Sequence, residues 1–181
     1  MSERKKYSFE EVESLAEQAA QNAMNHFRYG LTCSECVLKG VLDLGISDLP
    51  EEIVALSSGF GGGMGETFHT CGAVNGGMMA IGSVIGRKNP YAKETFEERV
   101  DELHNTESGL YPIHGKYIKK IIKEKGTIEC RDMSIIYDMS TPEGKKERAR
   151  MCKHVIGLCA KNAVRAALTK DYLNASDPDE I

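Results

Sequence analysis

The segment from Cys71 to Ile85 places the strongest constraint on how this chain can fold. Its small residues are Gly72, Ala73, Gly76, Gly77, Ala80 and Gly82. Glycine disfavours the helical conformation, so this density of small side chains indicates positions where another backbone comes close. The segment therefore predicts a central helix over 71–85 with other helices packed closely around it.

A glycine-rich run over 59–65 breaks the helical pattern just before this central helix. Thr70 can cap the helix, which would place Cys71 in its first turn. Backbone amides are unpaired there and the helix dipole favours negative charge, so we expect the pKa of the Cys71 thiol to be lowered. A thiolate attacks disulfides and binds metals. His69 is either a base or proton relay for this thiol, or a solvated loop histidine.

The apolar spacing in the rest of the chain predicts further helices over 8–28, 33–44, 50–56, 91–104, 113–125 and from 142 to 168 or 172. Ser8 with Glu11 makes a capping box, Thr32 caps the second helix, and Thr141-Pro142-Glu143 is a strong helix start. The run 144–150, GKKERAR, is expected to be a solvated helix face. The segment 127–140 is ambiguous.

No segment alternates with period two between hairpin turns, so strands are not expected. The chain is predicted to be an all-α, single-domain helical bundle of six or seven helices, with a glycine-rich loop before the central helix. The domain is expected to span residues 1–172, and residues 173–181, which are polar, to form a loose tail.

Charge and hydropathy exclude several classes of partner. The net charge is -4, with both signs interspersed and no basic stripe, so nucleic acid is not an expected partner. No apolar run approaches the roughly 20 residues of a membrane span, and no apolar segment follows the basic N-terminus as in a secretory signal. We expect a cytoplasmic protein without membrane insertion, in which functional cysteines are metal ligands or reversible redox groups.

The remaining cysteines are open to chemical and to structural interpretations. Cys33 and Cys36 form a CxxC pair on one helix face, which suits a redox dithiol, half of a metal site, or core packing. Cys152 and Cys159 lie about 10.5 Å apart along their helix, too far to bridge each other, although each could reach another helix. Cys130 lies outside a clear helix beside Arg131, which could stabilise a thiolate.

These segments resemble a family of redox-active proteins named for the pattern C…GCAxxG…C…C, which are small helical proteins with four characteristic cysteines. The run FGGGMGETFHTCGAVNGG over 60–77 resembles the glycine run and the CGAxxG core of that family. TCSECVLKGVLDLG, IECRDMS and MCKHVIGLCAKNA resemble the other three segments. The resemblance places Cys33, Cys71, Cys130 and Cys152 as the four family cysteines, with Cys36 and Cys159 as extra ones that could also be the true matches.

The resemblance implies a redox role without settling the substrate, and related domains hold iron–sulfur centres. One hypothesis is thiol–disulfide exchange or electron transfer, with Cys71 as the attacking thiolate and Cys33 or Cys152 as the resolving thiol. A second is that Cys33, Cys71, Cys130 and Cys152 bind an iron–sulfur cluster or a zinc ion. A third is a non-enzymatic helical interaction module with inert cysteines.

The first two hypotheses make one shared structural demand, that these four cysteines meet near the start of the helix over 71–85. A thiol oxidoreductase or an electron-transfer protein would also need a redox partner protein. Homodimerisation is left open by the sequence.

Overall fold

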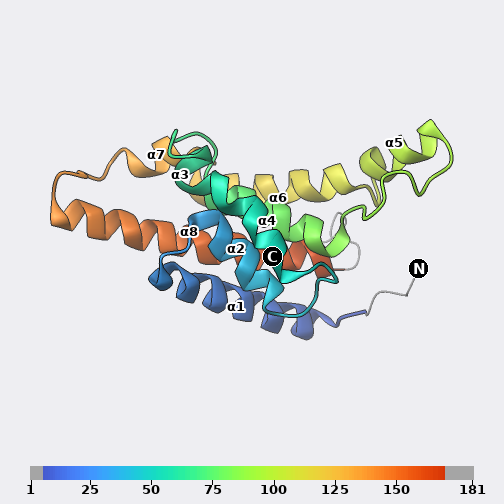
Figure 1. The fold of residues 1–181 in the computed structure, drawn as a ribbon, viewed down its shortest axis with the longest axis horizontal. Coiled ribbons are helices and arrows are strands. Elements are labelled where there is room, and N and C mark those ends of the chain that lie inside the picture. The colour runs from blue at the N-terminus through green and yellow to red at the C-terminus, as the bar shows by residue number, and fades with distance from the viewer. Residues whose placement is uncertain (1–5, 170–181) are drawn as a thin grey trace.

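The computed structural model describes residues 6–169, which form α-helices and 3-10 helices and contain no strand (Figure 1). The elements are α1 (Phe9–His26), η1 (Phe27–Tyr29), α2 (Cys33–Leu42), η2 (Glu51–Phe60), α3 (Gly61–Met64), α4 (Gly72–Ile85), α5 (Phe96–His104), α6 (Leu110–Lys125), α7 (Cys130–Ser134) and α8 (Pro142–Leu168). The all-α prediction is confirmed. None of the helices in this part of the chain has the length and apolar character needed to cross a bilayer.

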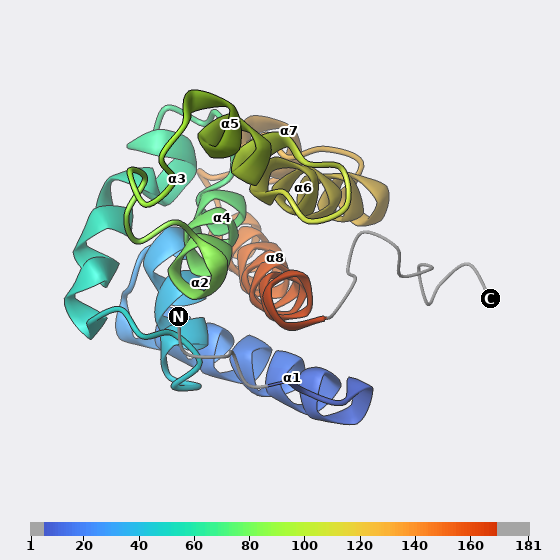
Figure 2. The ribbon, with the colours of Figure 1, turned by 90° about the vertical axis from the view of Figure 1, so that its right-hand side faces the viewer.

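Helix α8 lies at the centre of the bundle and contacts α1, α2, α4 and α6, which surround it in the end-on view (Figure 2). The buried side chains of these helices form one continuous hydrophobic core. Helix α5 extends away from this body beside the N-terminal end of α6 and buries none of its residues (Figure 1). The short helices α3 and α7 lie together at the opposite end of the molecule (Figure 1).

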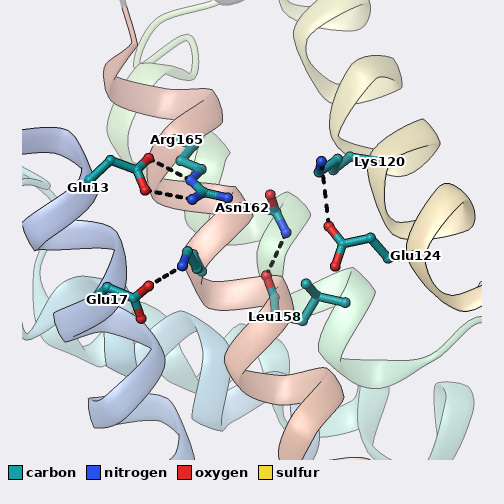
Figure 3. A network of polar contacts seen from close by, with 8 residues as sticks. Glu13, Glu17, Lys120, Glu124, Leu158, Asn162 and Arg165 are labelled. Atoms are coloured by element: carbon teal, nitrogen blue, oxygen red, sulfur yellow. Dashed lines mark hydrogen bonds and ion pairs between the residues drawn. The ribbon is translucent and has the colours of Figure 1, made fainter. Parts of the chain in front are cut away.

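The long helices α1 and α8 are joined by ion pairs as well as by core packing (Figure 3). Arg165 on α8 donates two hydrogen bonds to the Glu13 carboxylate on α1, at 2.7 and 2.6 Å. Lys161 on α8 binds Glu17 on α1. A bidentate arginine–carboxylate pair fixes orientation, so these contacts set how α1 lies along α8.

The small residues of α4 allow other elements to approach its backbone, as the sequence predicts, but not at every position. A Cβ atom at Gly76 would lie 2.6 Å from the Ser34 carbonyl oxygen of α2. A Cβ atom at Gly77 would lie 2.0 Å from the hydroxyl of Tyr117 on α6. At Gly82, by contrast, an added Cβ atom would meet nothing within 4 Å, so the prediction of a close approach is wrong there.

The predicted helix starts at Ser8, Thr32 and Thr141 are confirmed, and the first two carry complete capping boxes. The boundaries differ elsewhere. Helix α5 begins at Phe96 instead of Tyr91 because Thr95 caps it, and the predicted helix over 50–56 is the 3-10 helix η2.

The number of α-helices in the described residues is eight instead of six or seven. The additional ones are α3 and α7, which are only four and five residues long and too short to show an apolar period. The predicted tail over 173–181, and the alternative end of the last helix at residue 172, lie outside the described residues.

Candidate functional site

Four cysteines from four separate segments line one small cavity. Cys33 begins α2, Cys71 precedes α4, Cys130 begins α7, and Cys152 lies within α8. The cavity has a volume of about 30 Å³, which leaves room for roughly one or two water molecules. The four cysteines therefore line the same cavity beside the start of α4. All the cysteines of the chain are free thiols in this structure.

The glycine-rich segment forms one wall of this cavity, and its glycines are required there. Gly62 and Gly63 both line the cavity and have positive φ angles of +64° and +75°. A Cβ atom at Gly63 would lie 2.6 Å from the His69 carbonyl oxygen and 2.7 Å from Cβ of Cys130. Only glycine tolerates both this backbone conformation and this close approach.

Backbone hydrogen bonds fasten residues 68–71, which follow the glycine-rich run, to residues 128–131 at the start of α7. The Cys130 amide donates to the His69 carbonyl at 2.9 Å, and the Arg131 amide donates to the Phe68 carbonyl at the same distance. The Cys71 amide donates to the Ile128 carbonyl at 2.8 Å. These bonds hold Cys71 and Cys130 on adjacent backbones, which explains how residues far apart in sequence reach the same cavity.

The predicted setting of Cys71 needs correction. Thr70 does not cap α4; it pairs with Glu129 in an isolated antiparallel bridge, and Cys71 itself is the N-cap residue. Burial raises the pKa of Cys71 to about 11, although the backbone amides of Ala73 and Val74 act in the opposite direction. Desolvation therefore outweighs the helix N-terminus, and the expectation of an acidic Cys71 thiol is wrong.

The thiol with a lowered pKa is Cys152. The neighbouring Cys33 side chain, followed by the charge of Arg148, lowers the pKa of Cys152 against the effect of burial. The proximity of Cys152, together with burial, raises the pKa of Cys33. Of the two thiols, Cys152 therefore loses its proton more readily than Cys33. Both are partly exposed, whereas Cys71 and Cys130 are buried.

Arg148 was missed by the sequence analysis, which assigned the run 144–150 to a solvated helix face. Most of that run is exposed, but Arg148 lines the cavity and its Nε atom is buried without a hydrogen-bond partner. Its guanidinium lies 5.5 Å from the centre of the Phe68 ring and 3.9 Å from the Met139 sulfur. The sequence did contain one indication that Arg148 lies at the site: it is four residues before Cys152, and residues at this spacing share a helix face.

The other candidate residues lie away from the cavity. Cys36 and Cys159 are fully buried in the core, and neither lines the cavity. Burial raises the pKa of Cys36 to about 12 and also raises that of Cys159. The His69 side chain is exposed and does not line the cavity, so it is not placed to act on Cys71. Arg131 is likewise exposed.

The sulfur atoms do not form a ligand set for a metal. Across residues 6–169, no three histidine, cysteine, aspartate or glutamate side chains are grouped so that they could hold one ion. A tetrahedral zinc site or an iron–sulfur cluster needs such a group, with every sulfur directed at the metal. The present arrangement of Cys33, Cys71, Cys130 and Cys152 therefore does not fit the predicted metal centre.

Comparison with known proteins places the chain in a family. No curated protein and no solved structure matches it. Residues 31–166 match the family described as "Putative redox-active protein (C_GCAxxG_C_C)". The match spans all four cavity cysteines and the glycine-rich segment, and it covers most of the chain. The chain therefore belongs to the C_GCAxxG_C_C family of redox-active proteins.

Proposed function

We propose that the protein is a thiol–disulfide redox protein in which Cys33 and Cys152 form a reversible disulfide. The observation that carries this proposal is that Cys33, at the start of α2, and Cys152, in the middle of α8, line the same small cavity, where each has the largest effect on the other's pKa. Two cysteines that line a cavity of about 30 Å³ need little movement to form a disulfide. Both side chains are partly exposed, so a partner can reach them.

The step transfers two electrons. The Cys152 thiolate attacks one sulfur of a partner disulfide, forms a mixed disulfide and expels the other partner sulfur as a thiolate. Cys33 then loses its proton and attacks the Cys152 sulfur, which closes the Cys33–Cys152 bond and releases the second partner sulfur. The partner becomes a dithiol, with one proton from Cys33 and the other from water, and the protein becomes the disulfide.

Cys71 and Cys130 have a supporting role in this proposal. Both are buried in the same cavity as the reacting pair. The raised pKa of Cys71 makes it a poor first nucleophile but leaves it able to receive a disulfide by exchange. The partner would be a second redox protein with an accessible disulfide, and a reducing compartment such as the cytoplasm would keep the pair as thiols.

Equilibration in glutathione buffers of varied redox poise tests the proposal. Free thiols are counted after acid quenching, in the wild-type protein and in the variants Cys33→Ser and Cys152→Ser. We expect the wild type to lose two thiols reversibly and both variants to lose this transition. Cys159→Ala removes a fully buried thiol outside the cavity and should leave the transition unchanged. A transition that survives in Cys33→Ser and Cys152→Ser, or is absent from the wild type, would refute the proposal.

A further inference from the structure

Arg148 is the only charged side chain that lines the cysteine cavity in the described part of the chain. Its Nε atom is buried and has no hydrogen-bond partner there. Its neighbours are the Phe68 ring and the Met139 sulfur, neither of which carries a negative charge. Arg148 is half-buried, and a positive charge beside a cavity favours a negative charge within it. The cavity is therefore a favourable place for a negative charge.

No carboxylate lines the cavity, so its thiols are the groups of the described chain that can carry this charge. The titratable groups that face Cys152 are Cys33 from α2, Cys71 from the start of α4, Cys130 from α7 and Arg148 from α8 itself. Arg148 is the only cation in this set. It lies one helical turn before Cys152, where side chains share a face. The compensating anion is therefore the thiolate of the Cys33–Cys152 pair.

We propose that Arg148 is a positioning residue that holds the reduced Cys33–Cys152 pair in its singly ionised form and so shifts the redox couple toward the dithiol state. The inference rests on the proposed function. A disulfide is neutral, so the attraction between guanidinium and sulfur exists only in the reduced state. Stabilising the reduced form raises the reduction potential and makes the disulfide a stronger oxidant. Arg148 thus sets the direction in which the pair exchanges electrons.

The test compares Arg148→Gln, Arg148→Lys and the control Arg150→Gln, which removes an exposed charge two residues away on the same helix. The pH dependence of iodoacetamide alkylation is followed at the Cys152 peptide by mass spectrometry. Loss of a neighbouring charge should raise the apparent pKa of Cys152 by about 1 unit or more in Arg148→Gln. Arg148→Lys should restore most of the difference, and Arg150→Gln should match the wild type.

The glutathione equilibrium supplies the second measurement. At a pH above the apparent pKa of the native pair, the equilibrium between disulfide and dithiol should lie about tenfold further toward the disulfide in Arg148→Gln than in the wild type. This change corresponds to a reduction potential that is about 30 mV lower. If Arg148→Gln does not fold, Arg148→Met takes its place, because a methionine keeps the apolar contacts with Phe68 and Met139. A merely structural role would move neither the alkylation profile nor the potential.

The possible failures are distinguishable. A reversible disulfide whose alkylation profile and potential are the same in Arg148→Gln, Arg150→Gln and the wild type would overturn the role of Arg148 and leave the proposed function standing. A wild-type protein that forms no Cys33–Cys152 disulfide at any poise would overturn both.

Discussion

Replacement of Gly63 by alanine should destabilise the protein through two separate effects. The φ angle of Gly63 is +75°, and a residue with a Cβ atom loses about 1–2 kcal/mol in this left-handed conformation. The new methyl would also lie 2.6 Å from the His69 carbonyl oxygen and 2.7 Å from Cβ of Cys130. Overpacking of this kind costs about 1–3 kcal/mol. Gly63→Ala should therefore lower the free energy of unfolding by about 2–5 kcal/mol.

Gly65 provides a matched control in the same segment. Its φ angle is +72°, but the nearest atom to an added Cβ is the Gly59 carbonyl oxygen at 3.7 Å, an ordinary contact. Gly65→Ala should therefore show only the conformational cost of about 1–2 kcal/mol. The difference between the two variants isolates the contact of Gly63 with the backbone at His69 and the side chain of Cys130.

Urea unfolding under reducing conditions, with linear extrapolation to water, measures both variants. Because the clash must push the glycine-rich segment away from α7, Cys130 should also be alkylated faster in folded Gly63→Ala than in folded Gly65→Ala. Equal losses of stability in the two variants, with equal alkylation of Cys130, would show that the glycine-rich segment does not form the wall of the cavity described here.

Three further predictions concern the bundle that supports the site. Gly76→Ala would place its methyl 2.6 Å from a carbonyl oxygen of α2 and should lower the free energy of unfolding by about 1–3 kcal/mol. The methyl of Gly82→Ala would meet nothing within 4 Å, so this variant should be more stable than the wild type by up to about 1 kcal/mol in thermal or urea unfolding. The pairing with Arg165 lowers the pKa of Glu13. The Glu13–Arg165 pair therefore contributes its full stabilisation of the folded state above the unfolded pKa of about 4.3, and this stabilisation is lost as the pH falls through the folded pKa. Glu13→Gln should flatten the acid part of the curve of unfolding free energy against pH. Tyr117→Phe removes a 3.3 Å hydrogen bond to a backbone carbonyl of α4 and should cost about 1 kcal/mol, and an unchanged urea midpoint would contradict that bond.

The sequence was sufficient to predict most of the helices, because their starting signals are local. Ser8, Thr32 and Thr141 each accept a hydrogen bond from a backbone amide of the following turn, as their spacing predicts. The short helices α3 and α7 were not predicted, because they depend on contacts with residues far away in the sequence and on an unusual backbone conformation. Helix α3 contains two glycines in the left-handed conformation, and the first amides of α7 bond to carbonyls of residues 68 and 69.

The four cavity cysteines could be named from their resemblance to a family, but their ionisation could not. The position of Cys71 at a helix start is local information and indicates a lowered pKa, whereas its burial depends on how α2, α7 and α8 close over it and raises the pKa. Arg148 was missed for the same reason. A run of charged residues on a helix covers every face, and only the packed structure shows which one faces inward.

The identity of the disulfide that forms first tests the proposed pairing of Cys33 with Cys152 most directly. Reduced protein is oxidised with a small excess of glutathione disulfide, quenched with acid, digested, and analysed for cross-linked peptides by mass spectrometry. We expect the cross-link between Cys33 and Cys152 to appear first and to dominate. A first product that joins Cys36 or Cys159 instead, or an oxidised protein in which Cys33 and Cys152 both remain free, would contradict the pairing.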